Sequence, residues 1–264
     1  MNGPKKPATE CIVFLAHHTE ESAMAALAKL REECGSSFTL VPLFDQTRKA
    51  FSIEHIANAR SCNCAQLTRQ LPYREKHREH PGTLWPRNIE LPLMGFFQEH
   101  SQYEYYWLME YDVRFTGHWM DFFRNFAGNE SDLLATTIFD FGFRPGWDNW
   151  KTLKSPQRIP DQARVRALLS LCRLSNTALR AMHEAYCNGW SGHYEVTIPT
   201  ILKTRGLKLE DFGGSGRYVA SGNANRFYRN TPAVAGLAPG TFTVAANTIS
   251  ADYPANMLWH PIKS

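Results

Sequence analysis

Two carboxylates, Glu110 and Asp112, stand two residues apart directly after an apolar, aromatic stretch of the sequence. That stretch, YEYYWLM over residues 103–109, has the composition of a buried β-strand. Carboxylates at positions i and i+2 of a strand share a face, so both groups can converge on one ligand. Such a pair suits Mg²⁺ or Mn²⁺, which prefer oxygen ligands and often complete their shell with substrate phosphates. The alternative is that the acids pair with Arg114.

The N-terminal part of the chain predicts elements that would place further polar groups near this pair. In sequence order, the pattern predicts a strand over residues 10–16, a helix over residues 20–33 and a strand over residues 38–44. Thr19 is a plausible N-cap of the helix. A β-α-β order favours a parallel sheet, in which ligands bind beyond the carboxyl ends of the strands. His17, His18 and Asp45 follow the two strands, so we expect them to contact a nucleotide.

The rest of the chain predicts further helices and strands without repeats or a clear linker. Helices are expected over residues 53–60, 89–100, 118–126, 163–187 and 198–206, and a strand over residues 131–137. Ser175 interrupts the long helical segment and can cap its second part. Residues 46–84 predict mainly a long loop, and the Gly-, Pro- and Trp-rich residues 141–158 a loop that lines a pocket. We therefore predict one α/β domain, residues 1–264, with a mostly parallel central sheet flanked by helices.

The residues around the acidic pair carry a longer pattern. The matching residues are Tyr105, Trp107, Glu110, Asp112, Val113, Arg114, Phe115, Thr116, Gly117, His118 and Trp119. This segment resembles the core of a large family of predicted glycosyltransferases, with the pattern Y-x-W-x-x-E-x-D-V-R-[FY]-T-G-H-W. The resemblance implies a GT-A-like fold, with a nucleotide-sugar half at about 10–125 and an acceptor half at about 126–264. Glu110 departs from the usual Asp, so either both acids or Asp112 alone would bind metal.

The resemblance also implies a general base, and Glu195 stands where inverting GT-A enzymes hold it, just before a helix. This group would take the proton of the acceptor hydroxyl as that hydroxyl attacks the anomeric carbon. Partial desolvation would raise its pKa toward neutrality. Alternatively, Glu195 caps the helix or pairs with an arginine. Asp148 is the second candidate for the base.

Aromatic residues make up 12% of the chain and include seven Trp. Trp147 and Trp150 flank Asp148, while Trp190 and His193 precede Glu195. We expect these four aromatic residues to contact the acceptor and the aromatic excess to line a sugar-sized cleft. Packing in the core is the alternative for Trp147 and Trp150.

The C-terminal residues supply another candidate ligand. In several GT-A families a late histidine completes the metal shell, and in metal-independent ones late basic residues neutralise the diphosphate. His260 fits the first role and Lys263 the second. Arg114 and Asn88 complete the predicted nucleotide-sugar site. The glycines of residues 213–216 predict a flexible turn, with a phosphate cradle as the alternative.

Composition excludes several other classes of protein. The 29 basic and 25 acidic residues give a net charge of +4, too small an excess for a typical nucleic-acid-binding protein. The G-x-G-x-x-G and P-loop patterns are absent, which disfavours dinucleotide oxidoreductases and P-loop NTPases. No signal peptide or membrane span is recognised, so the six cysteines are predicted to be reduced in a cytoplasmic protein. The basic run 69–80 predicts either a solvated loop or a lip that contacts an anionic substrate or membrane.

These features together predict a metal-dependent glycosyltransferase that uses Mn²⁺ or Mg²⁺. Its partners would be a nucleoside diphosphate sugar and a glycan or lipid-linked saccharide, and it would act in the cytoplasm or peripherally at the inner membrane face. Two alternatives stay open: a metal-dependent phosphohydrolase or nucleotidyltransferase, and a non-catalytic carbohydrate-binding protein.

Overall fold

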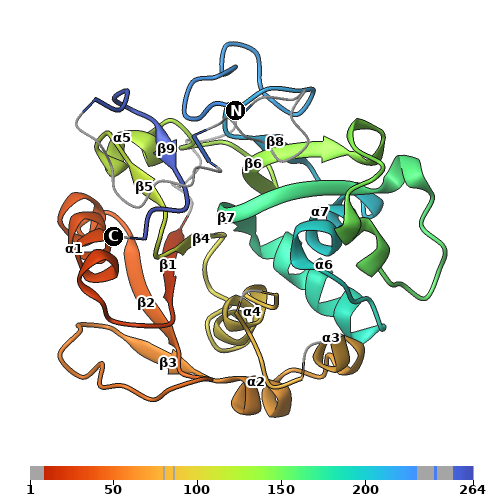
Figure 1. Cartoon of the computed structure of the whole chain (residues 1–264), viewed down its shortest axis with the longest axis horizontal. Helices are drawn as coiled ribbons and strands as arrows, with labels where there is room; N and C mark the ends of the chain where they lie inside the picture. Colours follow the sequence, from red (N-terminus) through yellow and green to blue (C-terminus); the bar gives the residue numbers. More distant parts are fainter. Residues whose placement is uncertain (1–8, 80, 86, 231–240, 243–251, 264) are drawn as a thin grey trace, which may run out of the picture.

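The computed structural model describes residues 9–79, 81–85, 87–230, 241–242 and 252–263, and its centre is a seven-stranded sheet (Figure 1). The strand order is β3-β2-β1-β4-β7-β6-β8. Neighbouring strands are parallel except where β7 pairs, because β7 runs antiparallel to both β4 and β6. The predicted α/β class with a mostly parallel central sheet is therefore confirmed.

The sheet consists of β1 (Glu10–Ala16), β2 (Thr39–Asp45), β3 (Arg60–Cys62), β4 (Tyr105–Glu110), β6 (Leu133–Asp140), β7 (Val165–Ser175) and β8 (Leu209–Asp211). A second small sheet pairs β5 (Arg114–Phe115) with β9 (Leu258–Trp259). The helices are α1 (Glu21–Cys34), α2 (Cys64–Gln70), α3 (Arg74–Glu79), α4 (Glu90–Glu99), α5 (Trp119–Arg124), α6 (Asn176–Cys187) and α7 (Tyr194–Thr204). None of the described helices is both long enough and apolar enough to cross a membrane.

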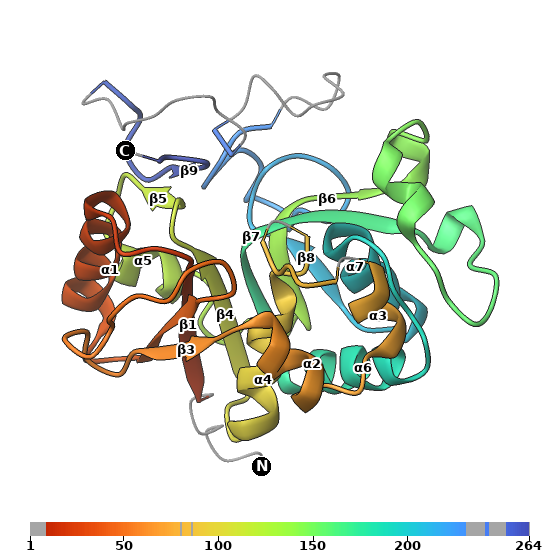
Figure 2. The same cartoon turned by 60° about the horizontal axis from the view of Figure 1, so that its bottom comes forward.

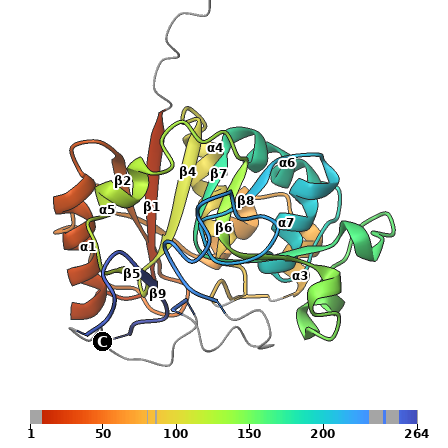
Figure 3. The ribbon, with the colours of Figure 1, turned by 90° about the horizontal axis from the view of Figure 1, so that it is seen from above.

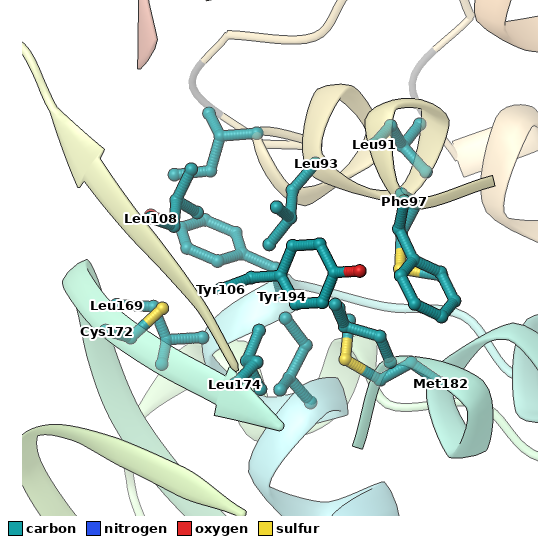
Figure 4. Packing of buried hydrophobic residues seen from close by; sticks show 14 of the residues in the cluster. Leu91, Leu93, Phe97, Tyr106, Leu108, Leu169, Cys172, Leu174, Met182 and Tyr194 are labelled. Carbon is teal, nitrogen blue, oxygen red and sulfur yellow. The ribbon is translucent and has the colours of Figure 1, made fainter. Parts of the chain in front are cut away.

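Helices cover both faces of the sheet, with α1 and α5 on one side and α4, α6 and α7 on the other (Figure 3). Each side has its own apolar cluster. Figure 4 shows the second side, where Leu93 of α4, Leu108 of β4 and Cys172 of β7 meet. Because both faces are covered, β1 and β4 are apolar except for Glu10 and Glu110 at their ends, and they lack a polar alternation.

The carboxyl ends of β1 and β4 point toward the small β5–β9 sheet (Figure 2). β1 and β4 are adjacent and parallel, in a register that places Leu15 beside Glu110. The segment after β4 is therefore presented at the same edge of the sheet as the segment after β1. This edge is where the sequence predicted ligand binding.

Several predicted elements are confirmed, among them the strands at 10–16, 38–44, 103–109 and 131–137 and the helices at 89–100 and 118–126. Pro92 lies in the first turn of α4, where a missing N–H is tolerated. The Ser175 hydroxyl accepts a hydrogen bond from the backbone N–H of Ala178 and caps α6 as predicted. The last helix begins earlier than predicted, at Tyr194.

The prediction of a helix over 163–174 is wrong. Residues 165–175 form β7, a central strand of 11 residues with β4 on one side and β6 on the other. All but Leu168 of its residues are buried. The periodicity of a segment apolar on all sides does not separate a buried strand from a helix, so the pairing partners decide the outcome.

The prediction of a mainly irregular segment over 46–84 is also wrong, because β3, α2 and α3 lie within it. Residues 53–60, predicted as a helix, instead form turns that lead into β3. Thr19 is not the cap of α1, since Glu20 occupies that position and supplies no side-chain cap. The prediction of a loop over 141–158 is confirmed. Apart from an isolated bridge between Lys154 and Ser191, this segment contains only short 3-10 turns.

Most of the tryptophans belong to the core, which corrects the expectation that they line a cleft. Trp107, Trp119, Trp150 and Trp259 are at most 7% exposed. Trp107 alone packs against four phenylalanines: Phe122, Phe123, Phe126 and Phe212. The aromatic excess therefore mainly fills the interior beside the site.

The basic run 69–80 is neither a loop nor wholly solvated; its last residue, His80, lies outside the described residues. It contains α3, whose Lys76 is fully buried. The Lys76 ammonium lies 2.6 Å from Oε1 of Glu90 and donates to the carbonyl of Gly192 at 2.5 Å. This contact ties α3 to α4 and to the turn before α7. Membrane contact through the remaining basic residues stays a prediction.

Replacing Lys76 with methionine is expected to lower the free energy of unfolding by about 3–5 kcal/mol, because it leaves the buried Glu90 carboxylate without its cation. Urea unfolding followed by circular dichroism measures this change. The matched control is Arg78→Met, which removes an exposed i,i+3 pair with Glu75 and should cost less than about 1 kcal/mol. The double variant K76M/E90L should recover most of the loss. Equal stability of the two single variants would contradict the prediction.

Candidate active site

Two neighbouring carboxylates and one histidine distant in the sequence form a cluster suited to a metal ion. Glu110 ends β4, Asp112 follows it by two residues, and His260 comes directly after β9. One ligand atom of each lies within 4.8 Å of the other two. Nε2 of His260 is 3.5 Å from Oδ1 of Asp112. The structure therefore brings together the three residues that the sequence predicted as metal ligands.

Backbone pairing with the C-terminal segment is what places His260 in this cluster. The register of β5 and β9 puts Arg114 opposite Trp259 and Phe115 opposite Leu258. Beyond His260, the N–H of Ile262 donates to the carbonyl of Asp112 at 2.8 Å. The β5–β9 pairing and this hydrogen bond thus hold the C-terminal segment against the loop that follows β4.

The cluster is buried and only partly satisfied by protein groups. Glu110 and Asp112 are 3% and 2% exposed. Burial raises the pKa of Glu110, and repulsion from Asp112 and Glu195 raises it further, while the Ser170 hydroxyl and Lys263 oppose the rise. Among the described residues, Oε1 of Glu110, Oδ1 of Asp112 and Nδ1 of His260 are buried without a hydrogen-bond partner. Unsatisfied buried oxygens of this kind fit a divalent cation, which would supply the missing partner.

Glu195, the predicted base, lies in the first turn of α7 and is 8% exposed. Burial raises its pKa to about 7, although the nearby Arg166 guanidinium acts in the opposite direction. Its Oε2 is 3.8 Å from Nδ1 of His193, the N-cap residue of the helix. The charge of Glu195 contributes to the raised pKa of Glu110, so the two carboxylates interact electrostatically. A carboxyl group with a pKa near neutrality can act as a base at physiological pH.

Asp148, the second candidate for the base, has different surroundings. Its side chain is 88% exposed and pairs with Lys151 at 2.9 Å. The hydrogen bond and charge of Lys151 lower the pKa of Asp148, so it is a weaker base than Glu195. Unlike Glu195, Asp148 is not buried, and it is not one of the three residues of the candidate metal cluster.

The four predicted acceptor residues occupy unlike environments. Trp147 is half-buried and its ring lies 6.4 Å from that of His193, close to Glu195. Trp150 is 3% exposed and donates to the carbonyl of Arg144, so it supports the loop. Trp190 packs against the apolar cluster that includes α6. Trp147 and His193 are therefore the two that flank the candidate base.

Beyond the carboxyl end of β1, His17 and His18 join an aromatic group. The ring of His17 lies 4.8 Å from Trp85 and 5.0 Å from Tyr111, and that of His18 lies 4.4 Å from Tyr111. Burial and His18 lower the pKa of His17, while Asp45 and Asp112 oppose this change. Nδ1 of His17 is buried without a partner among the described residues. The predicted nucleotide site is thus bounded by ring faces and one free imidazole nitrogen.

Asp45 and Asn88, also predicted to bind the nucleotide, are both buried. The Asp45 carboxylate accepts a hydrogen bond from the N–H of Thr47 and shapes the turn after β2. The Asn88 amide donates to the carbonyl of Thr83, while its oxygen is buried without a partner among the described residues. Asp45 has a local structural task, whereas Asn88 retains an acceptor that nothing described satisfies.

A cavity of about 480 Å³ lies between the start of α1 and the C-terminal segment. It is lined by Glu20, Glu21, Ser22, Ala25, Arg114 and Lys263. The Arg114 guanidinium donates to the carbonyls of Tyr111, Val113 and Ser22, so it braces the loop that carries Asp112. Lys263 also acts on the metal-ligand candidate Glu110, because its positive charge lowers the pKa of that carboxyl group.

The glycine-rich segment 213–216 forms a structured turn around Asp211. The N–H groups of Gly213 and Gly214 both donate to Oδ1 of Asp211 at 3.0 Å, and the Tyr228 hydroxyl donates to the same carboxylate. Gly213 has a φ of +148°, a conformation that disfavours a side chain. A turn is found here as predicted, and the N–H groups of Gly213 and Gly214 are already used by a buried carboxylate, which disfavours a phosphate cradle.

Sequence reasoning missed four residues of the site: Trp85, Tyr111, Arg166 and Ser170. Arg166 and Ser170 lie on β7, the segment predicted as a helix, so their approach to Glu195 and Glu110 was hidden. Tyr111 stands between the two acids, and its position offered a signal that was not used. Trp85 had no signal apart from its residue type.

Comparison with known proteins adds a family and two solved structures. Residues 65–131 match a protein family described as "Protein of unknown function (DUF3405)". No curated protein sequence matches the chain. Among solved structures, the apo bifunctional glycosyltransferase WbbM is similar, with 8% identity, a TM-score of 0.43 and coverage of 76% of this chain. The similar region spans 38% of the WbbM chain.

A second similar structure is the galactosyltransferase LgtC in complex with donor and acceptor sugar analogues. It has 11% identity, a TM-score of 0.40 and coverage of 83% of this chain and 74% of its own.

Proposed function

We propose that this protein transfers a sugar from a nucleoside diphosphate sugar to a hydroxyl of a glycan or glycolipid acceptor, with the help of a divalent metal. The observation that carries the proposal is the convergence of two groups at one edge of the sheet. A buried carboxylate-histidine cluster with three unsatisfied atoms lies near a buried carboxyl group whose pKa is close to 7. A metal-assisted transfer to a hydroxyl needs both.

Asp112, Glu110 and His260 would hold Mn²⁺ or Mg²⁺. Two carboxylates suit either ion, and the imidazole favours Mn²⁺ because Mg²⁺ rarely takes nitrogen ligands. When bound, the metal would neutralise the negative charge that develops on a diphosphate leaving group. Lys263 lines the adjacent cavity and would add positive charge at the same end of the diphosphate.

Glu195 would accept the proton of the acceptor hydroxyl as that oxygen attacks the anomeric carbon. Its pKa near 7 leaves a large fraction ionised at neutral pH while keeping it basic enough to take a proton. Attack from the side opposite the diphosphate would invert the anomeric configuration. Asp148 stays the second candidate for this role, with the disadvantage of its pairing to Lys151.

The remaining groups divide between the two substrates. His17, His18 and Trp85 would bind the nucleoside through ring contacts beyond β1, with Asn88 as a polar contact. Trp147 and His193, which flank Glu195, would contact the acceptor sugar. An acceptor attached to a lipid would place the protein peripherally at a membrane face.

Thermal unfolding in the presence of nucleoside diphosphates tests the proposal. We expect UDP, GDP, CDP, ADP or TDP to raise the midpoint by roughly 5–10 °C at 100-fold excess over Kd, and only when Mn²⁺ or Mg²⁺ is present. The requirement for metal follows from the orphaned oxygens of Glu110 and Asp112. EDTA should reverse the shift. If no diphosphate stabilises the protein with metal, the transferase proposal fails.

The alternatives give different outcomes in the same assays. A phosphohydrolase or nucleotidyltransferase would bind nucleotides but break a P–O bond, whereas a glycosyltransferase breaks the bond between the anomeric carbon and the diphosphate oxygen. A donor labelled with oxygen-18 at the oxygen between the anomeric carbon and the diphosphate identifies the broken bond. The label stays in the released diphosphate if the carbon–oxygen bond breaks, and it stays on the sugar if a P–O bond breaks. A carbohydrate-binding protein would bind saccharide without any nucleotide, and Asp112→Asn would leave that binding intact.

A further inference from the structure

Arg166, the second residue of β7, is a buried arginine with neither a hydrogen bond nor an ion pair to the described residues. Arg166 is 4% exposed, and its Nε is buried without a hydrogen bond. Within the described parts of the chain, its guanidinium makes neither a hydrogen bond nor an ion pair. The group carries five N–H donors and a permanent positive charge.

Arg173 on the same strand shows how the fold treats a structural arginine. Its guanidinium donates to the backbone carbonyls of Phe126, Asn129 and Ser131 and lies 3.7 Å from a carboxylate oxygen of Glu10. Nε of Arg173 is also buried without a partner, so the two arginines differ in these contacts of the terminal nitrogens. Within the described parts of the chain Arg166 has none of them, although it is almost equally buried. Since burying an unpaired charge is costly, the fold itself does not account for Arg166. Such an imbalance is expected where a ligand supplies the missing partner.

The position of Arg166 indicates which ligand that is. Its guanidinium carbon lies 4.0 Å from the centre of the Trp147 ring, and that ring contacts His193. Burial lowers the pKa of Arg166, the Glu195 carboxylate opposes this change, and the positive charge of Arg144 adds to it. Arg166 therefore packs against Trp147, and its charge interacts with those of the candidate base and of Arg144.

We propose that Arg166, held against Trp147, binds an oxyanion of the acceptor and thereby selects acceptors that carry a carboxylate or phosphate next to the reacting sugar. This inference rests on the proposed function, because it assigns the acceptor side of that site. A planar guanidinium matches a carboxylate or phosphate with two parallel hydrogen bonds, which a neutral sugar hydroxyl does not offer. Trp147 would both orient the guanidinium group of Arg166 and provide a ring face for the sugar.

Binding of small sugars measured by ligand-observed NMR tests this inference. The probes are glucuronic acid for the carboxylate, glucose 6-phosphate for the phosphate, and glucose as the neutral control, each with and without UDP and Mn²⁺. We expect the wild-type protein to bind at least one anionic sugar about 10-fold or more tightly than glucose. In Arg166→Met this preference should fall to about 1-fold, and Arg166→Lys should keep part of it. The matched control is Arg205→Met, which removes an exposed arginine paired with Glu184 and should keep the full preference.

Stability provides a second readout, which separates a ligand-binding arginine from a structural one. Arg166→Met should leave the melting temperature unchanged or raise it, because it removes a buried charge without protein partners. A large fall in melting temperature would overturn the inference, as would equal binding of anionic and neutral sugars, no binding of any sugar, or an anion preference that survives in Arg166→Met. Competition between the anionic sugar and UDP would also overturn it, since the sugar would then occupy the donor site. If no nucleotide binds but the Arg166-dependent preference persists, the transferase proposal fails and the oxyanion site stands.

Discussion

Asp112→Asn is expected to abolish metal-dependent nucleotide binding and to reduce sugar transfer by at least about 10³-fold, equivalent to roughly 4 kcal/mol of transition-state stabilisation. The variant keeps the size and shape of the side chain but replaces an anionic ligand with a neutral amide. Asp112 is 2% exposed and has an unsatisfied Oδ1 beside His260, so its charge is available to a cation. Release of nucleoside diphosphate from a panel of sugar nucleotides measures the loss.

Stability separates a metal ligand from a structural aspartate. Because Asp112 is buried beside another carboxylate, its replacement by asparagine should leave apo-protein stability unchanged or raise it. The control is Asp121→Asn on α5, an exposed residue paired with Arg124, which should retain activity. Glu110→Gln decides whether the second acid also binds metal. An Asp112→Asn protein that still shifts its melting temperature with Mn²⁺ and UDP would exclude Asp112 as a ligand.

The local part of this site was predictable from sequence. Glu110 and Asp112 follow an aromatic, apolar stretch whose composition predicts a strand. The expectation that both acids share a face of that strand is wrong, because β4 ends at Glu110 and Asp112 lies in the turn after it. His17 and His18 follow a strand in the same way. The order of parallel strands then places both segments at one edge of the sheet, as observed.

The parts that sequence reasoning missed depend on pairing between distant segments. β7 is mostly apolar on both faces, since helix α7 covers one face and the opposite layer covers the other. Its two arginines, Arg166 and Arg173, cannot be told apart by their sequence context alone. Only the tertiary structure shows that the terminal nitrogens of Arg173 donate to backbone carbonyls, while Arg166 makes no such bond within the described residues; Nε of both is buried without a partner. Lys76 gives the opposite lesson, since a charged run that predicts solvent exposure contains a buried lysine held by Glu90 and by the carbonyl of Gly192.

Glu195→Gln is expected to reduce kcat by about 10²–10⁴-fold while leaving metal-dependent nucleotide binding intact, because the amide cannot accept a proton. In the wild-type protein, kcat/KM should rise about tenfold per pH unit below about pH 7 and level off above it, since burial raises the pKa of Glu195 to about 7 and only its ionised form is a base. The variant should lack this rise. Proton NMR of the product from the wild-type protein should show inverted anomeric configuration.

The pH dependence of stability supplies a test of the same carboxyl group that requires no substrate. The folded-state pKa of Glu195 lies above its ordinary value of 4.5, so its protonated form is favoured by folding. Its contribution to stability is therefore present at low pH and is lost as the pH rises through about 7. Glu195→Gln cannot ionise, so its stability relative to wild type should increase between about pH 5 and pH 8, whereas Glu184→Gln, an exposed control on α6, should show no such trend. A pH-independent difference for Glu195→Gln would mean that this carboxyl group does not titrate near neutrality, and the base would then have to be sought elsewhere, with Asp148 as the first candidate.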